Sequence, residues 1–194
     1  MTSHGETGRT VAKSSATVVA KNISTVVAQD LATVVADLVG RLAGRGETLA
    51  TAESLTGGLL AATIVDVPGA SAVFRGGLVV YATDLKASLA GVPTDLLAAR
   101  GPVDPDVAAA LAAGARDRCD ATWGVATTGV AGPTPQDGAA VGTVFVAVAG
   151  PSSAGVALRL DGDRQAIRSA AVRAAIDLLV TTVGGRVIDE RAGQ

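Results

Sequence analysis

A serine that follows an apolar, strand-like segment is the first residue whose type and setting could do chemistry. Ser54 comes after residues 48–53 and is followed by Gly57 and Gly58 in the string AESLTGG. Backbone N–H groups at a helix start are unpaired and bind oxyanions or phosphates, and glycine lets a ligand approach the backbone closely. The pattern predicts an anion site beside a hydroxyl group. The simpler interpretation, in which Ser54 or Thr56 only caps the helix, stays open.

Tyr81 and Lys86 are the side chains that could activate this serine. Tyr81 lies near the end of a second apolar segment, residues 76–83, and Lys86 follows a few residues later. In a right-handed strand–helix–strand unit the carboxyl ends of both strands meet at one sheet edge, so we expect Ser54, Tyr81 and Lys86 to converge there. A neutral lysine could accept the serine proton if its pKa fell from ~10.4 toward 7–8. The alternatives, a solvated Lys86 and a tyrosine with its hydroxyl at the surface, stay open.

Two further segments could bind the rest of a substrate. Residues 127–133 (TTGVAGP) follow a buried strand, and their threonine hydroxyls and glycine N–H groups suit a phosphate or a carboxamide; a loop that only needs glycine torsions is the alternative. Arg164 and Arg168 lie at the start of the last predicted helix, where arginine could bind a phosphate bidentately. An ion pair with Asp161 or Asp163 is the alternative there.

The composition argues against several other classes of function. The chain of 194 residues carries 16 Lys and Arg against 18 Asp and Glu, without the basic excess typical of a nucleic-acid or anionic-membrane binder. The single cysteine, Cys119, excludes an intramolecular disulfide and a cysteine-based zinc site, and the single histidine, His4, argues against a Ser-His-Asp triad or a histidine-ligated metal. No apolar run approaches the ~20 residues of a membrane span. We expect a soluble, cytoplasmic protein that needs no metal and no cofactor.

The elements that must position these residues alternate between helix and strand. Helices are predicted from Asp30 to about residue 44, from Ser54 to about residue 65, from Asp104 to about residue 118 and over residues 163–183. Strands are predicted over residues 48–53, 76–83, 121–127, 142–149 and 156–160. This alternation predicts an α/β protein with a layered sheet that is at least partly parallel, and one domain over residues 30–194.

Residues 1–29 differ from the rest of the chain. They are rich in Ser, Thr and Lys, and the string TVVA recurs at residues 17–20, 25–28 and 33–36. An interval of eight residues is close to two helical turns, so these strings could line one helical face. We expect a poorly ordered or helical extension, with a helix that docks on a partner as the alternative.

Five of the segments described above resemble those of a known protein family. The strings AESLTGG (52–58), GGLVVYATDLK (76–86), TTGVAGP (127–133), VGTVFVAV (141–148) and GDRQAIR (162–168) are similar, in this order, to the C-terminal domain of the competence/damage-inducible protein CinA. That family is also known as the nicotinamide-nucleotide amidohydrolases, or nicotinamide mononucleotide deamidases. The resemblance covers residues 31–186. It implies a three-layer α/β/α sandwich with a mostly parallel or mixed central sheet.

The resemblance also implies a reaction and a set of site residues. The reaction is hydrolysis of the carboxamide of nicotinamide mononucleotide to nicotinate mononucleotide and ammonia. Ser54 falls on the nucleophile, Lys86 and Tyr81 fall on its activating partners, and Thr128 falls on an active-site hydroxyl. The expected substrate-binding residues are Leu55, Thr56, Gly57, Gly58, Gly129, Ala131, Gly132, Arg164 and Arg168. A small-molecule nucleotide is the expected partner, with neither nucleic acid nor membrane, and a homo-oligomer, with a dimer favoured, is the expected assembly.

Two positions depart from the family pattern near the expected site. Thr83 stands where the family usually has asparagine, and Ala140 stands where a polar or basic residue precedes Val-Gly-Thr. They leave open a catalytically silent nucleotide-binding module with a regulatory or DNA-damage role, and an amidase that acts on another carboxamide.

Overall fold

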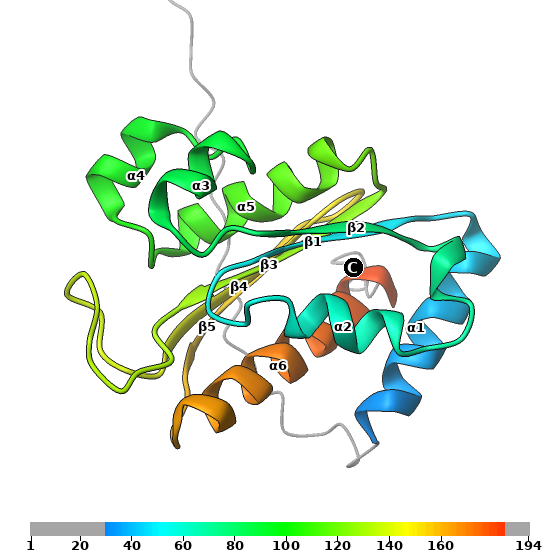
Figure 1. Cartoon of the computed structure of the whole chain (residues 1–194). Helices are drawn as coiled ribbons and strands as arrows, with labels where there is room; N and C mark the ends of the chain where they lie inside the picture. The colour runs from blue at the N-terminus through cyan, green and yellow to red at the C-terminus, as the bar shows by residue number, and fades with distance from the viewer. Residues whose placement is uncertain (1–29, 185–194) are drawn as a thin grey trace, which may run out of the picture.

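A computed structural model describes residues 30–184, and the extension predicted over residues 1–29 lies outside the described residues. The described chain forms a five-stranded sheet with strand order β2-β1-β3-β4-β5 (Figure 1). β1 pairs in parallel with β2 and β3, and β4 pairs antiparallel with β3 and β5, so the sheet is mixed, as predicted. The strands are β1 (Leu49–Glu53), β2 (Phe74–Val79), β3 (Trp123–Gly129), β4 (Thr143–Ala149) and β5 (Ala154–Arg159).

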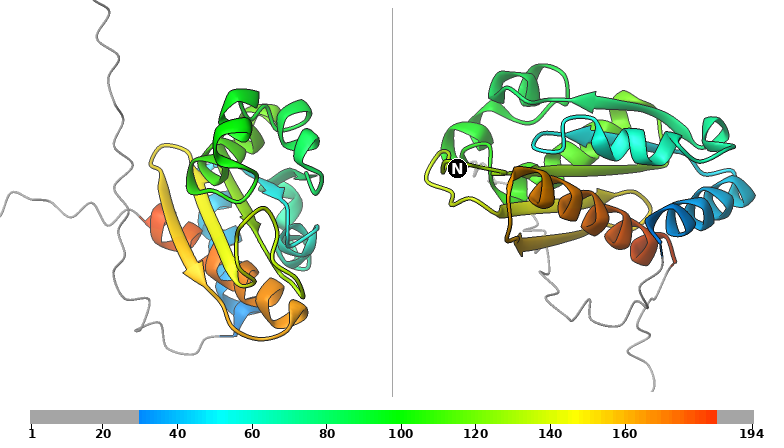
Figure 2. Two further views of the ribbon diagram at one scale, coloured as in Figure 1. Left: turned by 90° about the vertical axis from the view of Figure 1, so that its left-hand side faces the viewer. Right: turned by 60° about the horizontal axis from the view of Figure 1, so that its bottom comes forward.

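Helices cover both faces of the sheet. They are α1 (Leu31–Arg45), α2 (Leu59–Val65), α3 (Thr83–Ser88), α4 (Thr94–Arg100), α5 (Pro105–Arg118) and α6 (Arg164–Gly184), with a short 3-10 helix at Ala70–Ala72. Helices α1, α2 and α6 lie on one face, and α3, α4 and α5 lie on the other (Figures 1 and 2). The two faces bury separate apolar clusters. The three-layer α/β/α sandwich is therefore confirmed.

Local sequence explains most of these elements. In α1 the residues Val34, Val35, Leu38 and Leu42 share one buried face, and Gly46 ends the helix in the left-handed conformation, with φ 63°. Burial of each leucine is worth about 1.5–3 kcal/mol. Asp30 precedes the helix, but its side chain makes no capping hydrogen bond.

No helix within the described part of the chain is long and apolar enough to cross a membrane.

The helix predicted to open at Ser54 begins only at Leu59. Gly57 and Gly58 take φ values of 59° and 95°, which a right-handed helix cannot include, so residues 54–58 form a series of turns. Strand β2 ends at Val79, whereas the sequence pattern predicted that it would continue to residue 83. Both differences enlarge the loops at the carboxyl ends of β1 and β2. The segment from Ser54 to Gly58 is called the nucleophile loop below.

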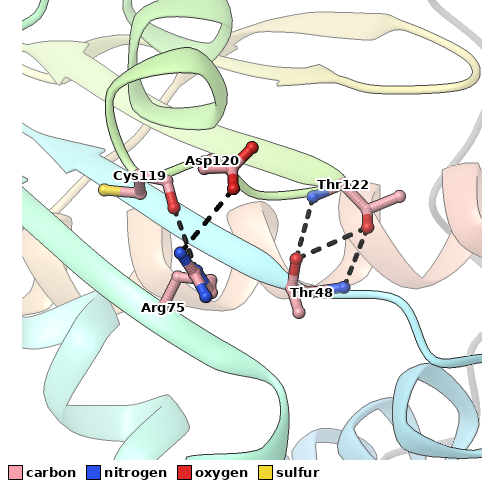
Figure 3. Close-up of polar contacts among 5 residues, drawn as sticks. All are labelled: Thr48, Arg75, Cys119, Asp120 and Thr122. Atoms are coloured by element: carbon pink, nitrogen blue, oxygen red, sulfur yellow. Dashed lines mark hydrogen bonds and ion pairs between the residues drawn. The ribbon is translucent and has the colours of Figure 1, made fainter.

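Polar contacts align the opposite, amino ends of the strands (Figure 3). The N–H of Thr48 donates to the hydroxyl of Thr122 over 3.0 Å, and the N–H of Thr122 donates to the hydroxyl of Thr48 over 3.0 Å. Arg75 donates to the Cys119 carbonyl over 3.0 Å and lies 3.9 Å from the Asp120 carboxylate. These contacts tie β1, β2 and β3 together at one end, which supports the register at the other.

Candidate active site

The carboxyl ends of β2, β1 and β3 bring the predicted residues together. Glu53 at the end of β1 pairs with Val79 of β2 and with Thr127 of β3, which makes Val80, Ser54 and Thr128 neighbours in the next row. A cavity of about 320 Å³ opens beside this row. Its lining includes Ser54, Leu55, Tyr81, Lys86, Thr128, Gly129, Ala131, Gly132 and Arg164. The predicted convergence of Ser54, Tyr81 and Lys86 at one sheet edge is therefore present in the structure.

Lys86 contacts Ser54 directly. Its Nζ lies 3.1 Å from Ser54 Oγ, 2.9 Å from the Val80 carbonyl oxygen and 3.3 Å from the Tyr81 carbonyl oxygen. In the ammonium form, three hydrogens meet these three oxygens. In the neutral form, two hydrogens stay on the carbonyls, and the lone pair is left facing the serine hydroxyl. The backbone carbonyls thus orient the Lys86 amine toward the Ser54 hydroxyl.

Burial also changes the protonation of Lys86. The side chain is only 1% exposed. Burial lowers the pKa of Lys86 to about 8, because the ammonium form loses its hydration, while the charges of Asp137 and Asp84 raise the pKa in part. A base with this pKa is neutral in a useful fraction of molecules near neutral pH.

Glu53 is a buried residue of the site that the sequence analysis missed. Its carboxylate accepts from the N–H groups of Gly58 at 3.0 Å, Leu60 at 3.0 Å and Ala61 at 2.8 Å. An acidic residue just before a predicted helix start was the available signal, because carboxylates complement the positive end of a helix. Glu53 therefore occupies the anion site predicted at the start of α2.

Fewer backbone N–H groups are free to bind an oxyanion than the sequence pattern predicts. The N–H of Gly57 donates to the Ser54 carbonyl oxygen at 3.1 Å, and the N–H of Gly58 belongs to Glu53, so neither is available to a substrate. Within residues 30–184, the N–H groups of Leu55 and Thr56 have no hydrogen-bond partner. Leu55 lines the cavity, whereas Thr56 is fully buried and lies outside its lining. The N–H of Leu55 is thus the donor best placed for an oxyanion.

The two predicted arginines have different positions. Arg168 donates to the carbonyl oxygens of Leu55 at 3.0 Å and Thr56 at 2.7 Å, so it holds the nucleophile loop from α6 and does not line the cavity. Arg164 does line the cavity and donates to the Tyr81 hydroxyl and the Gly132 carbonyl oxygen, both at 2.8 Å. Of the two, only Arg164 is placed to meet a ligand.

Tyr81 and Thr128 also make contacts that the sequence did not indicate. The Tyr81 side chain is 57% exposed and its hydroxyl accepts from Arg164, so its contact with Lys86 is made by its carbonyl oxygen. Thr128 is buried and donates to the Pro102 carbonyl oxygen at 2.6 Å. Neither Thr83 nor Ala140 is among the residues that line the cavity. Within the described residues, no group of three His, Cys, Asp or Glu side chains could hold a metal ion.

Comparison with known proteins agrees with the fold. The CinA C-terminal domain family matches residues 31–183. A CinA-like protein of Frankia casuarinae is 54% identical over 149 residues, which cover 76% of this chain and 34% of that protein. A CinA-like protein of Anaeromyxobacter sp. (strain Fw109-5) is 53% identical over 146 residues, which cover 73% of this chain and 35% of that protein. The chain spans about a third of the length of these curated relatives.

Solved structures give the same result. The competence/damage inducible protein CihA from Agrobacterium tumefaciens is 32% identical, with a TM-score of 0.77 over 83% of this chain and 99% of that one. A competence-damaged protein (CinA) superfamily protein from Escherichia coli is 30% identical, with a TM-score of 0.75 over 78% of this chain and 89% of that one. With the family match over residues 31–183, these likenesses show that the chain belongs to the CinA C-terminal domain family.

Proposed function

We propose that this chain is an amidohydrolase that converts nicotinamide mononucleotide to nicotinate mononucleotide and ammonia, with Ser54 as nucleophile and Lys86 as its base. The observation that carries the proposal is the 3.1 Å contact between the buried Lys86 Nζ and Ser54 Oγ. A lysine whose pKa is lowered to about 8 and whose other hydrogens are held by two carbonyls is equipped to take a serine proton. The resemblance to nicotinamide mononucleotide deamidases supplies the substrate.

The reaction follows from these positions. Neutral Lys86 accepts the Ser54 hydroxyl proton while Oγ bonds to the carboxamide carbon, and the carbonyl electron pair moves to its oxygen. The N–H of Leu55 stabilises this oxyanion, and one such donor is typically worth about 3 kcal/mol. As the carbonyl re-forms, the C–N bond breaks and Lys86 delivers its proton to the departing ammonia. Water then attacks the acyl-serine, gives a proton to Lys86, and the proton returns to Ser54 as the acid leaves.

Arg164 supports a phosphorylated substrate. Its guanidinium lines the cavity, and its two partners are a carbonyl oxygen and a phenol, both uncharged acceptors. A phosphate would form stronger, charge-assisted hydrogen bonds with it. Phosphate binding away from the reacting carbon can orient the carboxamide, and the energy then contributes to turnover as well as to affinity.

Ammonia release from nicotinamide mononucleotide tests the proposal. Ser54→Ala should lower turnover by at least ~10³-fold, while its stability cost should be about 1 kcal/mol. Ser152→Ala, which changes an exposed serine that contacts Thr182, is the matched control and should keep full activity. Turnover by Ser54→Ala would overturn the nucleophile assignment. Nucleotide binding without ammonia release by the unmodified chain would instead support a catalytically silent module.

The same assay tests the substrate. Nicotinamide mononucleotide should have a far higher kcat/KM than nicotinamide riboside, and free nicotinamide should scarcely react, because only the nucleotide carries the group that Arg164 would bind. Equal kcat/KM values for nucleotide and riboside would replace the nucleotide assignment with that of a general amidase.

A further inference from the structure

The hydroxyl of Thr128 can accept hydrogen bonds but has no hydrogen left to donate. Its Oγ lies 2.6 Å from the Pro102 carbonyl oxygen, and both residues are buried. A carbonyl oxygen can only accept, so the single hydroxyl hydrogen of Thr128 must point at Pro102. Turning that hydrogen elsewhere would leave a buried carbonyl unpaired, which is unfavourable. A group that approaches Thr128 Oγ from the cavity can therefore only donate a hydrogen bond to it.

This acceptor lies next to the nucleophile. Glu53 pairs with Thr127, so Ser54 and Thr128 are neighbours on adjacent strands, which are about 4.8 Å apart. Ser54 Oγ meets Lys86 of α3, and Thr128 Oγ meets Pro102 between α4 and α5, so both side chains lie on the face that these three helices cover. Both line the cavity there. Lys86 approaches Ser54 from the β2 side, through the Val80 carbonyl, whereas Thr128 is on the β3 side.

We infer that Thr128 is a specificity-determining residue, whose Oγ accepts a hydrogen bond from the carboxamide NH₂ and so favours the amide substrate over the carboxylate product. This inference rests on the proposed function. With the carbonyl oxygen at the Leu55 N–H and the nitrogen at Thr128, each end of the carboxamide meets its complement. The carboxylate product has no N–H and would set a charged oxygen against the Thr128 lone pair. The site thus holds substrate and rejects product.

Binding measured without turnover tests this inference. In Ser54→Ala, calorimetry gives the Kd values of nicotinamide mononucleotide and nicotinate mononucleotide. Adding Thr128→Val, which keeps the side-chain shape and removes the acceptor, should shift the ratio of the two Kd values toward the acid by about tenfold or more. The charge of Lys86 is present in both proteins, so its attraction for the acid cancels when the two ratios are compared. Adding Thr128→Ser instead should keep the original ratio.

A matched control and a second ligand keep the test independent of folding. Thr63→Val removes a hydroxyl that donates to the Leu59 carbonyl oxygen, away from the cavity lining, and should leave the ratio unchanged. 3-Acetylpyridine mononucleotide replaces the NH₂ with a methyl group, and its Kd in Ser54→Ala should be about tenfold or more above that of the amide. This comparison needs no change at Thr128.

The outcomes separate the two proposals. If the unmodified chain releases ammonia but Thr128→Val leaves the ratio unchanged, or if the acetyl ligand binds as tightly as the amide, the role of Thr128 is overturned and the proposed function stands. If the ratio shifts as expected but no ammonia is released, Thr128 reads the carboxamide and the proposed hydrolysis is overturned.

Discussion

At the scale of single residues, the protonation of Lys86 should determine how the reaction rate depends on pH. Only the neutral amine can accept the Ser54 proton, and the pKa of Lys86 is lowered to about 8 by burial. The neutral fraction rises as the pH passes upward through this value. The rate of a reaction that needs the neutral amine must follow the same rise.

We expect kcat/KM for nicotinamide mononucleotide to rise with pH through about 8 and then level off. Asp137→Asn should move this rise to lower pH, because the charge of Asp137 favours the ammonium form and raises the pKa of Lys86. Lys86→Met should remove most of the rate, and Lys86→Arg should not restore it, because arginine stays protonated. A pH–rate profile of each variant checks this.

The control at this scale is Tyr81→Phe. Because the contact of Tyr81 with Lys86 is made by its main chain, loss of the phenol should leave the pH rise in place. A rise that vanished in Tyr81→Phe, or that persisted unchanged in Lys86→Met, would assign the base to Tyr81.

At the scale of elements, α6 and β1 hold the nucleophile loop from two sides. Arg168 of α6 binds the loop carbonyls of Leu55 and Thr56, and Glu53 of β1 binds the N–H of the last loop residue and two N–H groups after it. The hydroxyls of Thr56 and Thr127 lie 2.8 Å apart and join the loop to β3. Arg168 holds the Leu55–Thr56 and Thr56–Gly57 peptide groups, which directly follow the peptide group that carries the N–H of Leu55, so these contacts bear on the chemical step more than on affinity.

Arg168→Ala should therefore lower kcat by about 10²-fold, near the effect of losing one oxyanion donor, with little change in KM. The loss should be equal for nicotinamide mononucleotide and nicotinamide riboside, because Arg168 does not line the cavity. Arg164→Ala is the matched variant from the same helix. It should raise KM for the nucleotide and narrow its advantage over the riboside. Steady-state kinetics that gave the two variants the same pattern would contradict this division of roles.

For the molecule as a whole, small residues permit close contact between α5 and the sheet. A Cβ added at Gly124 of β3 would lie 2.0 Å from the Ala112 carbonyl oxygen of α5, and one added at Gly114 of α5 would lie 1.8 Å from the Ala90 carbonyl oxygen. Small residues at these positions allow backbone to pack on backbone. This close approach sets the position of α5 and of the preceding segment, which carries Pro102, the hydrogen-bond partner of Thr128.

Gly124→Ala should lower the free energy of unfolding by about 2–3 kcal/mol or more, because the added methyl group would overlap backbone atoms that cannot move without disturbing the packing of α5. Gly40→Ala is the control from α1, where a Cβ would meet nothing within 4 Å. It should raise the free energy of unfolding by about 0.5–1 kcal/mol, since alanine favours the helix. Urea denaturation measures both, and a stable Gly124→Ala would mean that α5 can move away from the sheet.

The sequence by itself determined the elements with strong local patterns and the residues that share one sheet edge. The spacing of Val34, Val35, Leu38 and Leu42 predicted α1 because helical periodicity is a local property. Ser54 and Lys86 were predicted to meet because the carboxyl ends of neighbouring parallel strands lie at one edge. The homo-oligomer predicted from the resemblance to the family stays a prediction.

Only the tertiary structure decided which group each side chain binds. Arg164 and Arg168 lie on the same face of a helical pattern, yet Arg164 lines the cavity and Arg168 holds the nucleophile loop. The loop residues that Arg168 contacts are more than a hundred positions away in the sequence. The bond from Thr128 to Pro102 and the capture of the α2 N–H groups by Glu53 were equally out of reach. The physical reason is that a hydrogen bond depends on distances of a few tenths of an ångström, which packing sets and periodicity does not record.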